Sequence, residues 1–188
     1  HRRDISRVAK ADGHRVNAAI RDLQAHLVCD LEEFDHDVDL LNCANGVVNL
    51  HTGRLIPHNP EQRFTYCLDT PYDLHAESGD WRQFLQQVLD GQTDLISFLQ
   101  RAVGYSLTGH TREHKFFYLH GPTRAGKGTF MNVIAQMLGY EPLAVPVGFD
   151  TFSPKYGGDS QNFDLAHLRN SRYVMASESD NQQSLDSP

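Results

Sequence analysis

An apolar run that leads into a glycine-rich loop, with a helical apolar pattern directly after it, is the feature that most constrains the fold of this chain. Residues 116–120 read FFYLH and predict a strand, and the loop GPTRAGKGTF occupies 121–130. Gly121 and Gly126 bracket four residues and Lys127 comes next, which matches the pattern G-x-x-x-x-G-K. The spacing predicts a strand, a phosphate-binding loop and a helix in succession.

The residue types of this loop suit the binding of a phosphate. Backbone N–H groups can wrap an anion only where no Cβ intrudes, and the following helix presents the positive end of its dipole. We expect Lys127 to hold the terminal phosphates of ATP. Thr129 supplies the hydroxyl for Mg²⁺, because Gly128 stands where the common pattern has Ser or Thr. The residues expected to bind the nucleotide are Gly121, Pro122, Thr123, Arg124, Ala125, Gly126, Lys127, Gly128, Thr129 and Phe130.

The alternative interpretation of the loop is a glycine-rich turn that binds nothing. A helix after the loop argues against it. That helix is indicated by apolar residues at helical spacing and by Gly139 as a stop signal; the apolar residues are Phe130, Val133, Ile134, Met137 and Leu138. Together with the strand expected at 116–120, it gives the loop the context that a phosphate site requires.

A second apolar segment, 171–178, predicts a strand that ends in the acid Glu178, with Asp180 as a second candidate. A carboxylate at such a strand tip helps to hold Mg²⁺ or polarises the attacking water beside the phosphates. We therefore expect Lys127 and Glu178 to be catalytic, and Thr129 and Glu178 to be the metal residues. A surface acid after a core strand is the alternative for Glu178 taken alone.

Periodicity predicts three further helices before the loop. The first covers 16–27, the second 81–89, and the third starts at a cap formed by Thr93 or Asp94 and carries an apolar stripe into the core. A hairpin is expected over 46–56. Residues 139–165, which are rich in Pro, Gly, Ser and Asp, predict a linker with a strand hidden around 145–147.

Composition limits the remaining function classes. The 188 residues carry a net charge of −7, so binding to DNA requires a local positive path. The three cysteines have no CxxC spacing and are expected to be reduced thiols; the pairs His26 with Cys29 and His110 with His114 are weak candidates for a metal. No stretch approaches the roughly 18 apolar residues of a membrane span, and a cytoplasmic location is expected.

Several blocks of the sequence together resemble phage and plasmid primase-helicases of helicase superfamily 3. They are LLNCANGVVNLHTGRLIPHNPEQRFTYCLDTPYD, WRQFLQQVL, LQRAVGYSLTG, KFFYLHGPTRAGKGTF and LAHLRNSRYVMASE, and they run from about residue 40 to residue 180. In this family Lys127 and Thr129 would bind ATP and Mg²⁺, and Glu178 would be the Walker B acid. The form GKGTF is similar to one that is common there.

The resemblance implies an ATP-driven motor that encircles DNA as a homo-oligomeric ring, usually a hexamer, and unwinds it. The implied fold is α/β: an incomplete AAA-type P-loop NTPase core at 110–188, after a mostly helical α+β region at 1–109 that contains the hairpin. The family's polar sensor, arginine finger and DNA hairpin would lie beyond Glu178. We therefore expect a fragment, with a primase or initiator domain elsewhere in the protein, that binds ATP and hydrolyses it poorly, because a lost arginine finger costs roughly 10³ to 10⁵ in rate.

Two other functions are compatible with the same residues. A nucleoside monophosphate kinase also uses a GKGT loop, although the loop there resembles an N-terminal element and this chain shows no arginine-rich lid. A non-catalytic interaction module is the third reading, in which 1–109 docks a partner and the loop acts as a nucleotide-controlled switch. Transfer of phosphate to a nucleoside monophosphate separates the kinase from the other two.

Overall fold

The chain divides into two compact units, residues 1–34 and residues 35–188. The computed structural model describes residues 13–26, 28–152 and 167–177. The first unit contains helix α2 (Gly13–His26) and a short 3-10 turn, η1 (Leu31–Glu33). Helix α2 confirms the helix expected over 16–27. Its apolar stripe is open to solvent, since Val16, Ile20 and Leu23 are 43%, 46% and 57% exposed.

The second unit starts with a three-stranded antiparallel sheet, β1 (Leu40–Cys43), β2 (Gly46–Asn49) and β3 (Arg54–Ile56). Strands β2 and β3 confirm the hairpin expected over 46–56. The Asn49 side chain shapes its turn by accepting hydrogen bonds from the N–H groups of His51 and Thr52, at 3.0 and 2.9 Å. Strand β1 was not expected from the sequence, and it pairs Leu41 with Val48 in the buried centre of the sheet.

Three helices follow: α3 (Gly79–Val88), α4 (Thr93–Leu107) and α5 (Lys127–Met137). All three were expected, but two details of α4 were wrong. Thr93 and Asp94 lie inside the helix, whose N-cap position is Gln92, and no side chain there caps it. The stripe also leaves the core at its N-terminal end, where Leu95 and Phe98 are 38% and 47% exposed. Helical spacing shows which residues share a face, and the neighbouring segments decide how far along the helix that face is covered.

Helix α5 ends at the glycine that the sequence indicated. Gly139 has φ +73°, its N–H bonds to Gln136 O at 3.1 Å, and the next N–H, of Tyr140, bonds to Ala135 O at 3.0 Å. This pair of bonds is the Schellman motif, which satisfies carbonyls at the end of a helix and needs a residue in the left-handed region. The side chain of Thr70 donates a further bond to Met137 O, at 3.0 Å.

A second sheet has two parallel strands, β4 (Ala144–Gly148) and β5 (Tyr173–Ser177), and the turn η3 (Phe149–Phe152) follows β4. These strands confirm the two expected at 145–147 and at 171–178, although Glu178, the last residue of the second, lies outside the described residues. The strand expected at 116–120 is absent: the segment has no strand partner in the described part of the chain, and Phe116 is 88% exposed. A strand exists only when another strand completes its hydrogen bonds, which an apolar run cannot specify alone.

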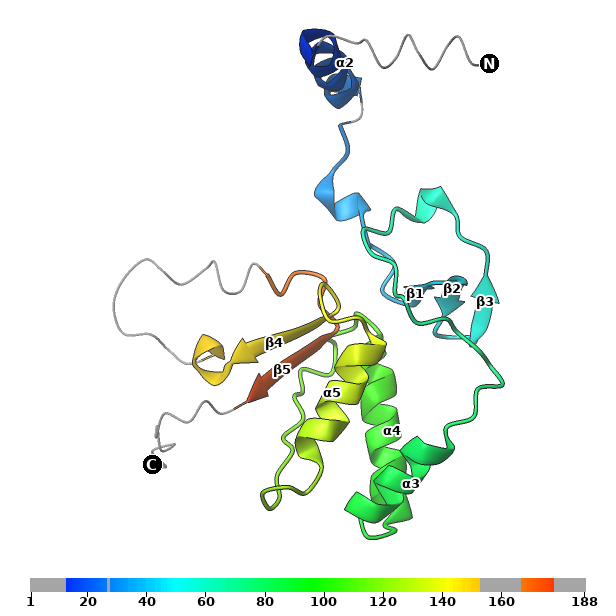
Figure 1. The fold of residues 1–188 in the computed structure, drawn as a ribbon, viewed down its shortest axis with the longest axis vertical. Helices are drawn as coiled ribbons and strands as arrows, with labels where there is room; N and C mark the ends of the chain where they lie inside the picture. The colour runs from blue at the N-terminus through cyan, green and yellow to red at the C-terminus, as the bar shows by residue number, and fades with distance from the viewer. Residues whose placement is uncertain (1–12, 27, 153–166, 178–188) are drawn as a thin grey trace. The chain divides into compact units, whose positions relative to one another are not determined.

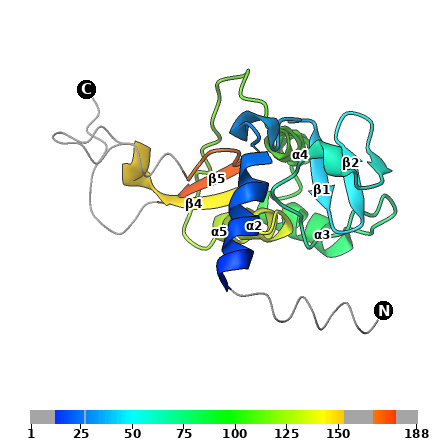
Figure 2. The same cartoon turned by 90° about the horizontal axis from the view of Figure 1, so that it is seen from above.

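One hydrophobic core connects the two sheets through α5. Leu41 and Val48 of the first sheet, with Tyr66 and Leu68, pack in one cluster with residues of α5, of β4 and of the segment between them; these are Ile134, Ala135, Leu138, Leu143 and Ala144. Figures 1 and 2 both show α5 between the two sheets. The boundary expected near residue 110 lies inside the unit 35–188, and the division into the domains 1–109 and 110–188 stays a prediction.

Arg172, just before β5, joins three distant elements of this unit. Its Nη1 donates to Leu107 O at the end of α4, and its Nη2 donates to Leu40 O at the start of β1, both at 2.7 Å. The backbone N–H of Arg172 also bonds to Leu143 O at 2.8 Å. A guanidinium suits this role because its planar fork can bridge separate carbonyls.

Replacing Arg172 by Met should lower the free energy of unfolding by about 2 kcal/mol, because two partly buried carbonyls lose charged donors. The exposed Arg169 offers a matched control, and Arg169→Met should change the stability by less than about 0.5 kcal/mol. Urea denaturation of the two variants measures both quantities. Equal losses in the two variants would contradict the bridging role of Arg172.

The reactivity of Cys43 and Cys67 tests how strand β1 is packed. Cys43 is 4% exposed, and burial raises the pKa of its thiol, with a smaller contribution from the neighbouring Cys67. Because the thiolate is the reactive form, Cys43 should resist iodoacetamide at mildly alkaline pH, whereas the exposed Cys67 reacts. Mass spectrometry of the peptides, with and without denaturant, measures this difference. Labelling of Cys43 as fast as Cys67 in the folded protein would show that β1 is not packed as described.

Candidate phosphate-binding site

The loop from Gly121 to Gly126 turns back on itself before α5 begins. Arg124 and Gly126 have φ values of +65° and +81°, and the N–H of Ala125 bonds to Pro122 O at 3.3 Å. Gly126 is the N-cap position of α5. These two residues in the left-handed region, with Ala125 between them, reverse the direction of the main chain within a few residues. Position 126 favours glycine because a Cβ atom disfavours a positive φ.

Lys127 is the first residue of α5, and its side chain reaches back over the loop. Its Nζ donates hydrogen bonds to Gly121 O and Pro122 O, each at 2.7 Å. The ammonium group is thereby held at the mouth of the loop, next to the first glycine of the motif. A phosphate bound there would meet a positive charge whose position the loop itself fixes.

The N-terminus of α5 adds hydrogen-bond donors to this charge. The first intrahelical bond joins the N–H of Phe130 to Gly126 O at 2.9 Å, so the preceding N–H groups have no partner within the helix. No side chain caps the helix at Gly126. Gly128 and Thr129 in this turn are exposed. Free N–H groups at a helix start, together with the helix dipole, favour an anion.

The structure brings together most of the residues expected in the site. Pro122, Thr123 and Arg124 are exposed on the loop, and the lysine, Gly128 and Thr129 follow in the first turn of α5. Phe130 takes a different role, because its side chain is buried and stacks on Trp81 with ring centroids 5.6 Å apart. Glu178 and Asp180 lie outside the described residues, so their distance to Lys127 stays untested.

The sequence predicted helix α3 but not its position directly against the loop. Phe84 and Val88 of α3 are the nearest side chains to Gly126, and Trp81 stacks on Phe84 with ring centroids 5.4 Å apart. The spacing of 84 and 88 shows that both residues share one face of α3. It does not show that this face meets a loop about 40 residues further along the chain, which only the tertiary structure determines.

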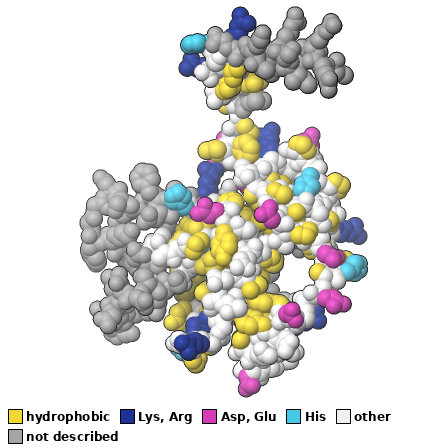
Figure 3. Space-filling view, in the orientation of Figure 1, with side chains coloured by type: hydrophobic (Ala, Val, Ile, Leu, Met, Phe, Trp, Pro, Cys, Tyr) yellow, Lys and Arg dark blue, Asp and Glu magenta, His cyan; other side chains and the backbone are white. Residues whose placement is uncertain are grey.

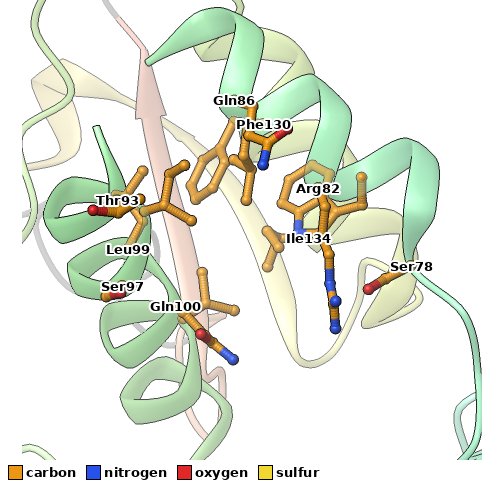
Figure 4. Close-up of a pocket in the computed structure, with 13 residues that line it drawn as sticks. Ser78, Arg82, Gln86, Thr93, Ser97, Leu99, Gln100, Phe130 and Ile134 are labelled. Atoms are coloured by element: carbon orange, nitrogen blue, oxygen red, sulfur yellow. The ribbon is translucent and has the colours of Figure 1, made fainter. Parts of the chain in front are cut away.

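A cavity of about 410 Å³ lies between α3, α4 and α5. Figure 4 shows residues of α3 and α4 around it, with Phe130 and Ile134 of α5 among its walls. Its other lining residues include Arg82, Gln86 and Gln100, and no residue from 121 to 129 takes part. The cavity is therefore lined by residues other than those of the loop.

The histidines considered for metal binding have other neighbours. His110 Nε2 lies 2.9 Å from Asp39 Oδ1, and His26 Nδ1 lies 2.8 Å from Asp22 O. Within residues 13–26, 28–152 and 167–177, no three side chains of His, Cys, Asp or Glu are grouped to hold a metal ion.

On the face shown in Figure 3, the Lys and Arg side chains of the described residues are scattered. No helix in the described ranges is long and apolar enough to cross a membrane.

Comparison with known families gives one match. Residues 3–90 match the family model described as D5 N terminal like. The match ends before the loop at 121–130, so it bears on the region that contains the first sheet and α3 and not on the candidate site itself. No curated protein matches the chain.

The first turn of α5 allows a direct test of the metal residue. A Cβ at Gly128 would meet nothing within 4 Å, so Gly128→Ser adds a hydroxyl without a steric conflict. Thr129→Val should weaken ATP binding in Mg²⁺ about tenfold, the effect of one lost hydroxyl contact, and leave binding in EDTA unchanged. Adding Gly128→Ser should restore part of the loss. Calorimetry measures the affinities, and an equal loss in EDTA would remove Thr129 from the metal site.

Proposed function

We propose that the chain belongs to a replication protein of the phage and plasmid primase-helicase type, and more specifically to an ATP-driven DNA helicase of superfamily 3. The D5 N-terminal-like match over residues 3–90 supports the first part of this proposal. In this proposal residues 121–129 bind the phosphates of ATP. The D5 N-terminal-like region precedes them in the chain, as the resemblance implies. The ring, usually a hexamer, and the DNA that it encircles belong to the assembled protein.

The observation that carries the proposal is the position of the Lys127 ammonium. It lies 2.7 Å from two loop carbonyls, beside a helix start whose N–H groups have no side-chain cap. The two carbonyls keep the charge in place without neutralising it. When phosphates bind, the lysine exchanges these neutral acceptors for anionic ones, which form stronger hydrogen bonds.

Mg²⁺ fits the residues that the proposal assigns to it. The hydroxyl of Thr129 is in an exposed first helical turn, on the residue next but one to Lys127, and a hydroxyl oxygen is a suitable ligand for a hard cation. Glu178 would follow directly after β5 and supply a carboxylate. When bound, the ion neutralises charge on the phosphates. The residues of this chain bind, orient and shield the phosphates around it.

Lys127→Ala tests the phosphate assignment. Removing the ammonium should reduce the affinity for ATP by at least about tenfold, since a charge-assisted contact contributes on the order of 1.5 to 3 kcal/mol. Lys115→Ala is the matched control, because Lys115 is an exposed lysine outside residues 121–130 and its removal should leave the affinity unchanged. Fluorescent ATP analogues measure both affinities.

The outcomes separate the candidate functions. Unchanged affinity in Lys127→Ala would remove the loop from nucleotide binding altogether. Phosphate transfer from ATP to a nucleoside monophosphate would favour the kinase, and nucleotide binding without hydrolysis in the assembled protein would favour the interaction module. ATP hydrolysis that DNA stimulates in the assembled protein would support the helicase.

A further inference from the structure

Helix α3 meets the phosphate loop at the glycine next to Lys127. A Cβ built on Gly126 would lie 2.8 Å from Val88 Cγ1 and 3.2 Å from Phe84 Cε2. The first of these distances is shorter than any real Cβ contact, so the absence of a side chain at Gly126 is what allows α3 to approach. A glycine at this position usually gives the phosphate access to the backbone. In this structure it also leaves room for Phe84 and Val88 of α3.

Helix α3 is itself fixed to α5 one turn beyond the loop. Trp81 stacks on Phe130 with an interplanar angle of 21°, and it also stacks on Phe84 at 26°. Leu85 of α3 is buried. The helix therefore contacts α5 at its N-cap through Phe84 and Val88, and at Phe130 through Trp81. Two contacts along one helix set its distance and its tilt.

The end of α3 is also well defined. The N–H of Gly91 bonds to Gln86 O at 2.8 Å, and Asp90 has φ +49°, which gives the helix a Schellman end immediately after Val88. The chain turns there into α4, whose first residue is Thr93. Val88 thus sits in the last turn of a helix that cannot extend or fray without breaking these bonds.

We propose that α3 supports the phosphate loop, with Phe84 and Val88 as positioning residues that hold Gly126 and the first N–H groups of α5 in place. Both residues fall within 3–90, so the region of D5 N-terminal-like sequence contributes directly to the geometry of the nucleotide site. The inference rests on the proposed function for its consequence, which is nucleotide affinity. The contact itself does not depend on that function.

The support explains how an event at the N-terminal region reaches the nucleotide. A shift of α3 moves the side chains that bound Gly126 on one side, and the left-handed turn at that residue moves with them. Because packed helices shift as rigid bodies, a small displacement of α3 is transmitted to the loop rather than absorbed. A partner that docks on α3 or α4 would change the affinity for ATP by this route.

Val88→Ala is the central variant, with Gln83→Ala as its control on an exposed position of the same helix. Val88 is 36% exposed, so the truncation loosens the contact without emptying the core. Hydrogen exchange of residues 121–129 should rise about fivefold in Val88→Ala, the factor expected for two lost methyl contacts, and should not change in Gln83→Ala. The affinity for ATP should fall by a similar factor.

Gly126→Ala, alone and combined with Val88→Ala, tests whether the two residues are in contact. The added methyl should abolish most nucleotide binding in the single variant, because it meets Val88 and because φ is +81°. In the double variant with Val88→Ala the shortest contact of the added methyl is removed, and binding should recover by about tenfold. The loss that remains comes from the backbone conformation and from the contact with Phe84.

Each outcome decides between the two claims. Loop exchange in Val88→Ala that equals Gln83→Ala would overturn the supporting role of α3, and so would a rise spread equally over β1 and β2. If the loop exchange rises in Val88→Ala but the unmodified chain binds no ATP, the support stands and the proposed function fails. If the chain binds ATP and the double variant recovers nothing, the function stands and the support fails.

Discussion

The burial of one face of α5 is the interaction on which the rest of the second unit depends. Ile134, Ala135 and Leu138 are 5%, 0% and 1% exposed, and they pack with residues of both sheets in one cluster. Burial of these three side chains removes apolar surface from water. The two sheets need this contact because a sheet of two or three short strands buries too little apolar surface to be stable alone. The helix thereby fixes the sheets around the loop that begins it.

This arrangement attaches the end of the candidate phosphate loop to the core through α5. The loop ends where α5 starts, α5 is held by the core at its middle and end, and α3 bounds Gly126 at its start. Arg172 and Thr70 add polar ties, to Leu40 and Leu107 and to the end of α5. A site that binds an anion benefits from such support, because its backbone N–H groups are then held in place before the anion arrives.

Local signals predicted local structure well. The hairpin over 46–56, the stop at Gly139 and the helix after the glycine loop were all expected from residue type and spacing, and the structure confirms them. The strand at 116–120 was wrong, and Phe117 instead contacts Phe98 edge to face with centroids 6.2 Å apart. Helices and turns close their hydrogen bonds within the segment, whereas a strand depends on a partner that can lie anywhere in the chain.

The sequence by itself determined the elements of the candidate site: a glycine loop, a lysine directly after its second motif glycine, a hydroxyl two residues later and a helix that follows. These depend on neighbours a few residues apart, which the order of residues specifies directly. Only the tertiary structure decided that α3 lies against Gly126 and that Arg172 reaches Leu40, because contacts between distant segments follow from how several apolar faces are buried at once.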